Sequence, residues 1–210
     1  HNMAIGSPQW MYKSGEAYTL DQSLKFDSGG TSYLSFTPSS AGNRKTWTWS
    51  GWVKRASLGT IQVLESVNAG SGNSNIFHIY LDSDDDIKIS LASFTIQTVA
   101  KYRDVSSWYH IMVVVDTTQA TDTNRFKIYV NGTQQTLTTS NTYPSQNDDL
   151  AFNQTSEHNI GRRDGDADRY TSSYLSELNF IDGQALTPAD FGETGDYGEW
   201  KPVEYSGTYG

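Results

Sequence analysis

The chain contains no cysteine among its 210 residues. Disulfide bonds and thiolate chemistry are therefore excluded, and a metal site would have to use oxygen ligands or histidine. Basic residues are also scarce, because 15 Lys and Arg stand against 24 Asp and Glu, and the formal net charge is −9. Without a long basic run, a nucleic-acid partner is not expected.

Long apolar runs are missing as well. No stretch approaches the roughly 20 apolar residues of a membrane-spanning helix, so membrane insertion is not expected. The N-terminus lacks a basic region followed by an apolar one, and no signal peptide is expected. Charged residues make up only 19% of the chain and aromatic residues 13%. This balance favours short strands with polar turns over helices.

Residues 108–132 are the most informative stretch of the sequence. Two strand-like runs flank a polar loop there, and the second run ends in Asn131-Gly132, a strong hairpin-turn signal. The first run is apolar on both faces, because Met112 and Val114 alternate with the core-facing isoleucine and valines. Such a strand is covered on both sides or presents one side to a partner.

Short alternating segments along the rest of the chain predict further strands. These are residues 23–26, 33–36, 47–54, 60–66, 76–81, 87–91, 95–100, 159–161 and 175–181. A single helical turn is expected at 187–191, with Thr187 as its cap and Pro188 at its first position. The pattern predicts an all-β fold, an antiparallel β-sandwich or jelly roll.

Three regions are expected along the chain. Residues 1–20 have no periodicity and are interpreted as an N-terminal arm. Residues 21–192 form the sandwich, and the Gly/Tyr-rich residues 193–210 are interpreted as a tail that leads to further domains.

The order of six segments carries a family resemblance. Read from Ser23 to Phe191, they are SLKFDSGGTSYLSF, WTWSGWVKR, WYHIMVVVD, RFKIYVNG, HNIGRRDG and YLSELNFIDGQALTPADF. This series resembles the laminin-G-like branch of the concanavalin A-like lectin/glucanase superfamily. The stretches GNRKTWTWSGWVKR, TYPSQN and FIDGQALTPADFGE are similar to parts of structural proteins of tailed marine bacteriophages. That resemblance implies a virion protein made in the host cytoplasm.

The resemblance leaves the function open, because the superfamily includes glycosidases, lectins and adhesion modules. Its glucanases carry paired carboxylates on one strand, and a retaining glycosidase needs two of them about 5–5.5 Å apart. In this sequence Glu65, Glu157 and Glu177 are isolated from other strand carboxylates. We therefore expect no catalytic residues and no hydrolase activity.

The best metal candidate is the loop that holds Asp164, Asp166 and Asp168. Alternating carboxylates can converge on one Ca²⁺, and the resemblance implies such a site because many laminin-G-like domains hold Ca²⁺ at the sandwich rim. The competing interpretation is a solvated acidic turn whose charge is balanced by neighbouring arginines. For the acidic stretch 82–86, an ordinary hairpin tip is the preferred interpretation.

Period-two counting also predicts an aromatic face. If their strands are neighbours, five side chains form one patch on the outside of a sheet: Trp52, His78, Tyr80, His110 and Tyr129. A sugar ring would stack on such a patch. Another subunit of the virion or a second copy of the chain would bury it equally well. The N-terminal arm, which carries Trp10, is a third candidate cover.

The sequence therefore leads to ranked hypotheses. The first is a non-catalytic, lectin-like module that recognises a host-surface glycan, with Ca²⁺ as an allowed cofactor. The second is a structural, oligomerisation or decoration module of a tail or capsid. A glucanase-type hydrolase is a remote third.

Overall fold

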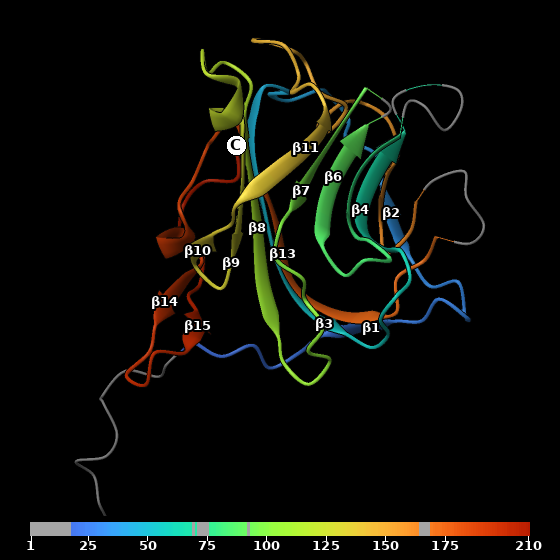
Figure 1. Cartoon of the computed structure of the whole chain (residues 1–210), viewed down its shortest axis with the longest axis vertical. Coiled ribbons are helices and arrows are strands. Elements are labelled where there is room, and N and C mark those ends of the chain that lie inside the picture. The colour runs from blue at the N-terminus through green and yellow to red at the C-terminus, as the bar shows by residue number, and fades with distance from the viewer. Residues whose placement is uncertain (1–17, 69, 71–75, 92, 164–168) are drawn as a thin grey trace, which may run out of the picture.

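The computed structural model describes residues 18–68, 70, 76–91, 93–163 and 169–210. Within these ranges the chain forms two antiparallel sheets that pack face to face, with a two-stranded hairpin outside them (Figure 1). The predicted antiparallel β-sandwich is thereby confirmed. None of the helical elements in the described ranges is long and apolar enough to cross a membrane.

Sheet A contains six strands in the spatial order β1-β13-β3-β8-β9-β10. Their bounds are β1 Leu24–Phe26, β3 Thr46–Arg55, β8 Tyr109–Asp116, β9 Phe126–Val130, β10 Thr133–Gln134 and β13 Ser173–Asp182. Sheet B contains seven strands in the order β11-β7-β6-β5-β4-β12-β2. Their bounds are β2 Leu34–Phe36, β4 Gln62–Asn68, β5 Ile76–Leu81, β6 Ile87–Leu91, β7 Phe94–Thr98, β11 Leu137–Asn141 and β12 His158–Ile160.

Three smaller groups of elements complete the described chain. The 3₁₀ turn η3 spans Asp122–Asn124, and η4 spans Pro188–Asp190. The outer hairpin pairs β14, Gly192–Thr194, with β15, Trp200–Pro202. The backbone N–H of Thr187 donates to Asp190 at 2.9 Å, so the predicted turn after the last long strand exists, but as a 3₁₀ turn.

The core follows from the alternation in the long strands. Trp47 and Trp49 of β3 are fully buried between the sheets, and the odd-numbered residues Ile111 to Val115 of β8 join them. The Trp47 ring meets Phe77 of sheet B edge-on, with centroids 6.1 Å apart. Stacked sheets bury such alternate side chains, and apolar burial is the main stabilising term.

The outer face of sheet A is covered by the chain itself. Met112 and Val114 of β8 pack with Phe191 and Tyr205, which belong to residues 184–209, termed here the C-terminal cover. Thr48 holds the start of this cover, because its hydroxyl donates to the carbonyl of Gln184 at 2.8 Å. The cover follows the left side of sheet A in Figure 1. It explains why β8 is apolar on both faces; Trp10 and its neighbours lie outside the described residues.

Two predicted turns have the expected chemistry. Asn131 and Gly132 both adopt positive φ, 48° and 76°, and join β9 to β10 through a two-residue turn. Positive φ at both central positions is typical of the hairpin turn that Asn-Gly favours. At the first turn, Asp27 accepts the backbone N–H of Gly29 at 2.9 Å, so its carboxylate stabilises the bend.

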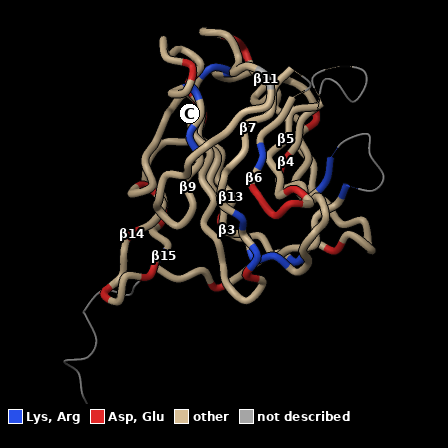
Figure 2. The backbone as a smooth tube through the Cα atoms, in the orientation of Figure 1, with Lys and Arg blue, Asp and Glu red and all other residues tan. Residues whose placement is uncertain are grey.

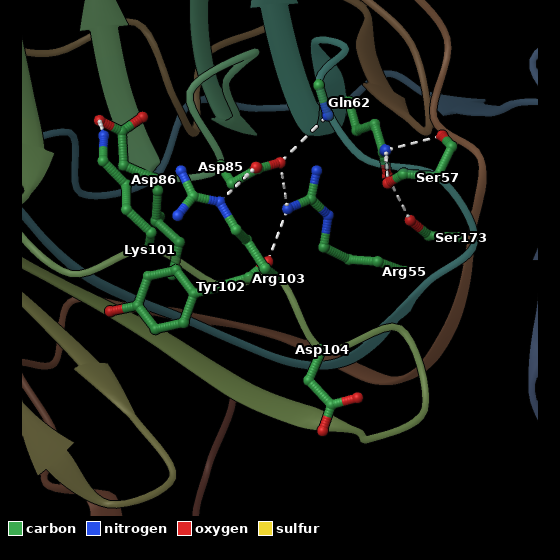
Figure 3. A network of polar contacts seen from close by, with 12 residues as sticks. Arg55, Ser57, Gln62, Asp85, Asp86, Lys101, Tyr102, Arg103, Asp104 and Ser173 are labelled. Atoms are coloured by element: carbon green, nitrogen blue, oxygen red, sulfur yellow. Dashed lines mark hydrogen bonds and ion pairs between the residues drawn. The ribbon is translucent and has the colours of Figure 1, made fainter.

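A polar network closes one end of the sandwich (Figure 3). The buried guanidinium of Arg55 points from the end of β3 to Asp85 in the β5–β6 turn, with Nη1 and Oδ1 2.9 Å apart. Arg103 contacts the other carboxylate oxygen of Asp85 at 3.0 Å. Lys101 lies 2.8 Å from Asp86, a fully buried carboxylate. Sheet A and sheet B are thereby linked by ion pairs as well as by apolar packing.

The carboxyl group of Glu65 is buried between the two sheets. Glu65 of β4 is 3% exposed and accepts the indole N–H of Trp49 at 2.6 Å. Burial raises the pKa of Glu65 from 4.5 to about 7, and the hydrogen bond from Trp49 opposes this shift. Burial disfavours the charged carboxylate, so the group is largely protonated in the folded protein below neutral pH.

This burial predicts how Glu65→Gln changes the pH dependence of stability. Between pH 4.5 and 7 the folded state holds the proton and the unfolded state releases it, so wild-type stability falls as the pH rises. Glutamine mimics the protonated acid and does not titrate. We expect the variant to gain on the order of 3 kcal/mol over wild type from pH 4.5 to pH 8.

Urea unfolding at several pH values measures this difference. Glu193→Gln, which removes an exposed carboxylate of β14, is the matched control and should follow the wild-type curve. If the free energy of unfolding of Glu65→Gln differs from that of wild type by the same amount at every pH, the raised pKa of Glu65 is contradicted.

Candidate functional site

The five residues predicted to form one aromatic face are divided between two opposite sheets. Trp52, His110 and Tyr129 lie on β3, β8 and β9 of sheet A, whereas His78 and Tyr80 lie on β5 of sheet B. All five alternate with core residues, so each lies on the outer side of its own sheet. The single patch is therefore wrong, because period two assigns a face of a strand but not the sheet that the strand joins.

On sheet A, Trp52 and His110 are directly opposite each other on paired strands. Their rings lie 5.1 Å apart, and the Trp200 ring of β15 stacks with His110 at 6.1 Å. Gly132 and Gly192 leave room for Trp200, since a Cβ on either would lie within 2.5 Å of its ring. The hairpin of the C-terminal cover is thus held on sheet A by an indole–imidazole–indole series.

Hydrogen bonds determine the tautomer of His110. The indole Nε1 of Trp200 donates to His110 Nδ1 at 3.1 Å, and an indole can only donate. Nδ1 is therefore the acceptor, and Nε2 carries the proton that faces the Ser50 hydroxyl at 2.8 Å. Burial lowers the pKa of His110 to about 4, so the imidazole is neutral at physiological pH.

An open groove of about 420 Å³ lies beside this series. Three tryptophans line it: Trp52 of β3, Trp108 before β8 and Trp200 of β15. Residues 18–23, termed the lead segment, also line the groove, together with Ser176, Lys201 and Pro202. Trp52 itself is 7% exposed, whereas Trp108 and Trp200 are half-buried.

Sequence reasoning missed most of this groove. Neither Trp108 nor Trp200 is among the residues that the sequence predicts for a ligand site. The only available signal was that both residues are tryptophans at the margins of strands. Tyr129 was assigned to the site, but it packs against the Met112 cluster and does not line the groove.

On sheet B, His78 and Tyr80 line a second, smaller pocket. Their rings stack 4.3 Å apart, and the Ser90 hydroxyl of β6 lies 3.3 Å from His78 Nε2. Arg163 and Arg169 complete its wall. The pocket has a volume of about 200 Å³ and shares no residue with the groove of sheet A.

The acidic stretches have different outcomes. In the stretch 82–86, Asp82 and Asp86 pair with Lys88, while Arg55 and Arg103 hold Asp85. This hairpin tip is therefore neutralised by protein cations. Asp164, Asp166 and Asp168 lie outside the described residues, and among the residues that the structure describes no group of three or more His, Asp or Glu could hold a metal ion.

The two packed antiparallel sheets define a lectin-like β-sandwich fold. A family model described as the concanavalin A-like lectin/glucanases superfamily matches residues 28–191. The chain belongs to this superfamily. A search of curated protein sequences finds no significant match.

Three solved structures illustrate the shared fold. The heptameric SAP-like pentraxin of Limulus polyphemus aligns with a TM-score of 0.54 and 20% identity, over 74% of this chain and 71% of the pentraxin. A candidate carbohydrate-binding protein of Bacteroides ovatus gives 0.55 and 13%, over 80% of this chain and 44% of that one. A mutant of the NanB sialidase of Streptococcus pneumoniae gives 0.55 and 14%, over 82% and 28%. This chain thus spans less than half of the latter two proteins.

The contact between Trp200 and His110 predicts the effect of Gly132→Ala. A Cβ at position 132 displaces the Trp200 ring, so water reaches His110 and its pKa rises from about 4 toward 6.5. Gly59→Ala is the matched control, because Gly59 also has positive φ, 68°, but a Cβ there meets nothing within 4 Å. Both substitutions cost roughly 1 kcal/mol of backbone strain, but only Gly132→Ala displaces the Trp200 ring.

NMR titration of the His110 ring measures the pKa in each variant. In wild type the unfolded chain binds the proton between pH 6.5 and 4 and the folded state does not, so this contribution to stability is lost as the pH falls. A His110 pKa that stays near 4 in Gly132→Ala would show that Trp200 does not keep water from the imidazole.

Proposed function

We propose that this chain is a non-catalytic, lectin-like module that binds carbohydrate in the groove of sheet A. The observation that carries the proposal is the convergence of Trp52, Trp108 and Trp200 on one open groove. They come from three separate segments of the chain, and the groove is large enough for sugar rings. Membership of a superfamily that includes lectins supports the proposal.

The chemistry of the groove fits a saccharide. Indole rings offer flat apolar surfaces on which the C–H face of a pyranose stacks. The polar residues Thr19, Asp21 and Gln22 also line the groove, with Lys201 at β15, and these groups can hydrogen-bond sugar hydroxyls. An apolar floor with a few polar groups at its margin is typical of sites that bind ligands by stacking and orient them by hydrogen bonds.

The non-catalytic part of the proposal rests on the environment of the carboxyl groups. Glu65 is sealed in the core and bonded to Trp49, so it cannot reach a bound saccharide. Asp21 is the carboxylate that lines the groove within the described residues, and a glycosidase uses two. Release of reducing sugar from β-glucans would overturn this part.

The biological setting in the proposal comes from the sequence. The stretches similar to tailed-phage structural proteins support a virion protein whose module contacts a glycan on the host surface. The proposal also includes a Ca²⁺ ion bound by Asp164, Asp166 and Asp168. The alternation of these carboxylates in the sequence supports this part of the proposal. Glycan titrations in Ca²⁺ and in EDTA test this component.

Trp108→Ala is the direct test of the groove. The side chain is half-buried, so its removal should leave the fold intact while deleting one stacking surface. We expect a loss of roughly two- to twelvefold in affinity for the glycan that wild type binds best on a glycan array, since stacking contributes about 0.5–1.5 kcal/mol. Calorimetric titration of that glycan gives the two dissociation constants.

Tyr197→Ala is the control for this experiment. Tyr197 is 97% exposed in the β14–β15 turn and does not line the groove, so its loss should leave the affinity unchanged. Equal affinities of wild type and Trp108→Ala would place any glycan site elsewhere.

A second candidate function is self-association, which one specific surface favours. β1 and β2 are the edge strands of sheets A and B on the same side of the sandwich. Leu24, Leu34 and Phe36 on these strands are 56%, 48% and 45% exposed. A cleft of about 340 Å³ runs between Leu24 and Leu34 toward Leu175. Exposed apolar side chains around a cleft are typical of a protein interface.

Leu34→Asp tests this second function. A charge at the centre of an apolar contact should dissociate any oligomer, whereas Leu58→Asp, at a leucine that is 38% exposed elsewhere, should not. Light scattering coupled to size exclusion measures the mass of each variant. If the wild-type protein is a monomer at high micromolar concentration, the second candidate function is wrong.

A further inference from the structure

The cleft between the edge strands β1 and β2 has a lining unlike that of the tryptophan groove. Its floor belongs to the core of the sandwich, because Leu175 is 2% exposed and Ile160 and Leu178 pack against the same core. Among the residues that the structure describes, the apolar side chains of the cleft are all aliphatic: Leu24, Leu34, Ile160, Leu175 and Leu178. Its volume of about 340 Å³ lies in the range of roughly 300–1,000 Å³ that is typical of ligand pockets.

A bulge in β13 marks the place where this cleft opens. The pairing of β1 with β13 ends at Leu24 and Leu175. Beyond this pair the register of β13 with β3 shifts, and Glu177 adopts a positive φ of 47°. The bulge changes the alternation of the strand, so Leu178 packs on the core while Glu177 is exposed. Backbone strain of this kind is concentrated at functional sites.

The cleft and the tryptophan groove meet at this bulge. Gln22, Ser23 and Ser176 line both of them. The Ser176 hydroxyl donates to the carbonyl of Gln22 at 2.6 Å and holds the lead segment on β13 at the boundary. Ser176 is also directly opposite Trp52 on the paired strand β3. A ligand at this boundary can therefore contact indole rings on one side and leucine side chains on the other.

The charges near the boundary favour a neutral ligand. Among the described lining residues, Asp21 and Glu177 carry negative charge and Lys201 carries positive charge, which leaves a net charge of −1. Figure 2 shows further acidic positions along the hairpin of β14 and β15. A free fatty acid would bring its carboxylate to this acidic edge, where like charges repel. An uncharged sugar carries no such penalty.

We propose that the groove and the cleft together bind a neutral saccharide that carries an alkyl or acyl chain. The sugar stacks on the tryptophans, and the chain lies among the leucines of the cleft. Affinity rises with each methylene group that leaves water for such an aliphatic lining. Protein interfaces are enriched instead in aromatic residues and arginine, and neither lines the described part of the cleft.

This inference rests on the proposed carbohydrate binding in the groove and deepens it, because it names an amphiphilic glycan as the ligand. The sugar and the chain contact different side chains, so their contributions can be measured separately. A groove that binds sugar without help from the cleft would leave the proposed function standing and the inference wrong.

The test compares octyl β-glucoside with methyl β-glucoside, which differ only in the length of the chain. The corresponding pair of β-galactosides repeats the comparison for a second sugar, and octyl tetraethylene glycol ether carries the same chain without a sugar. Calorimetric titrations below the micelle concentrations give the dissociation constants. For at least one sugar we expect the octyl glycoside to bind at least tenfold more tightly than both the methyl glycoside and the ether.

NMR titration of wild type locates the two parts of the ligand. The methyl signals of Leu34 and Leu178 should shift with the octyl glycoside and stay in place with the methyl glycoside. The indole N–H signal of Trp108 should shift with both, because the sugar is common to them.

Leu24→Ser should weaken binding of the octyl glycoside at least threefold and leave binding of the methyl glycoside unchanged. Leu24 is 56% exposed and lines the cleft but not the groove, so its loss removes only a contact with the chain. Leu58→Ser is the matched control, since Leu58 is an exposed leucine that lines neither cavity. Thermal unfolding checks that each variant is folded, and the wild-type comparison of chain lengths needs no variant.

Octyl glycosides that bind no more tightly than methyl glycosides would overturn the inference, whereas Trp108→Ala decides glycan binding in the groove. An octyl ether that binds as tightly as the octyl glycosides would overturn it too, because the sugar would then add nothing. The third contrary result is a wild-type dimer that Leu34→Asp dissociates and saturating octyl glycoside leaves intact. It would assign the cleft to a second copy of the chain.

Discussion

The structure depends on one constraint: β8, a central strand of sheet A, is apolar on both faces, and its neighbour β3 is buried on both. Two-sided burial is ordinary for a parallel sheet between helices, but an antiparallel sandwich usually leaves its outer faces to solvent. Here sheet B covers one side, and the C-terminal cover packs Phe191 and Tyr205 on the other. The tryptophan groove lies where β15 of this cover reaches Trp52 and leaves a gap toward the lead segment.

The charged side chains are also arranged unevenly in the molecule. The chain carries a formal charge of −9, yet the most crowded carboxylates, at the β5–β6 turn, are matched by Arg55, Lys88, Lys101 and Arg103. Arg55 and Asp86 are buried where the two sheets meet, so the ion pairs that they form act on their immediate surroundings. Arg103 is exposed, and solvent screens its charge. An acidic run in a sequence can thus be part of a structural network and need no metal ion.

The sequence predicted the sandwich and most of its strands for a clear physical reason. Alternation with period two is a local property, so the core faces of β3, β8 and β9 could be assigned from residues such as Trp47, Ile111 and Phe126. The Asn131-Gly132 turn was equally predictable, because both positions need positive φ. The short strand β11 was missed, since Leu137–Asn141 is polar and has little alternation.

The sites were predicted less well, because they depend on which distant segments meet. Nothing in the alternation of β5 indicates that His78 belongs to the sheet opposite Trp52. The contact of Trp200 with His110 joins residues 90 positions apart and needs the cover to be placed first. Arg163 and Arg169 flank the acidic loop in the sequence, and only the structure shows that they line the pocket on β5 and β6.

The pairing of the edge strands has a consequence for the order of folding. Leu24 of β1 pairs with Leu175 of β13, and Phe36 of β2 pairs with His158 of β12. The first two strands therefore have no partner until more than a hundred further residues have left the ribosome. Such non-local pairing slows folding, because loop-closure entropy is lost before the contacts form. Until β12 and β13 arrive, β1 and β2 are unpaired apolar strands that chaperones can recognise in the growing chain.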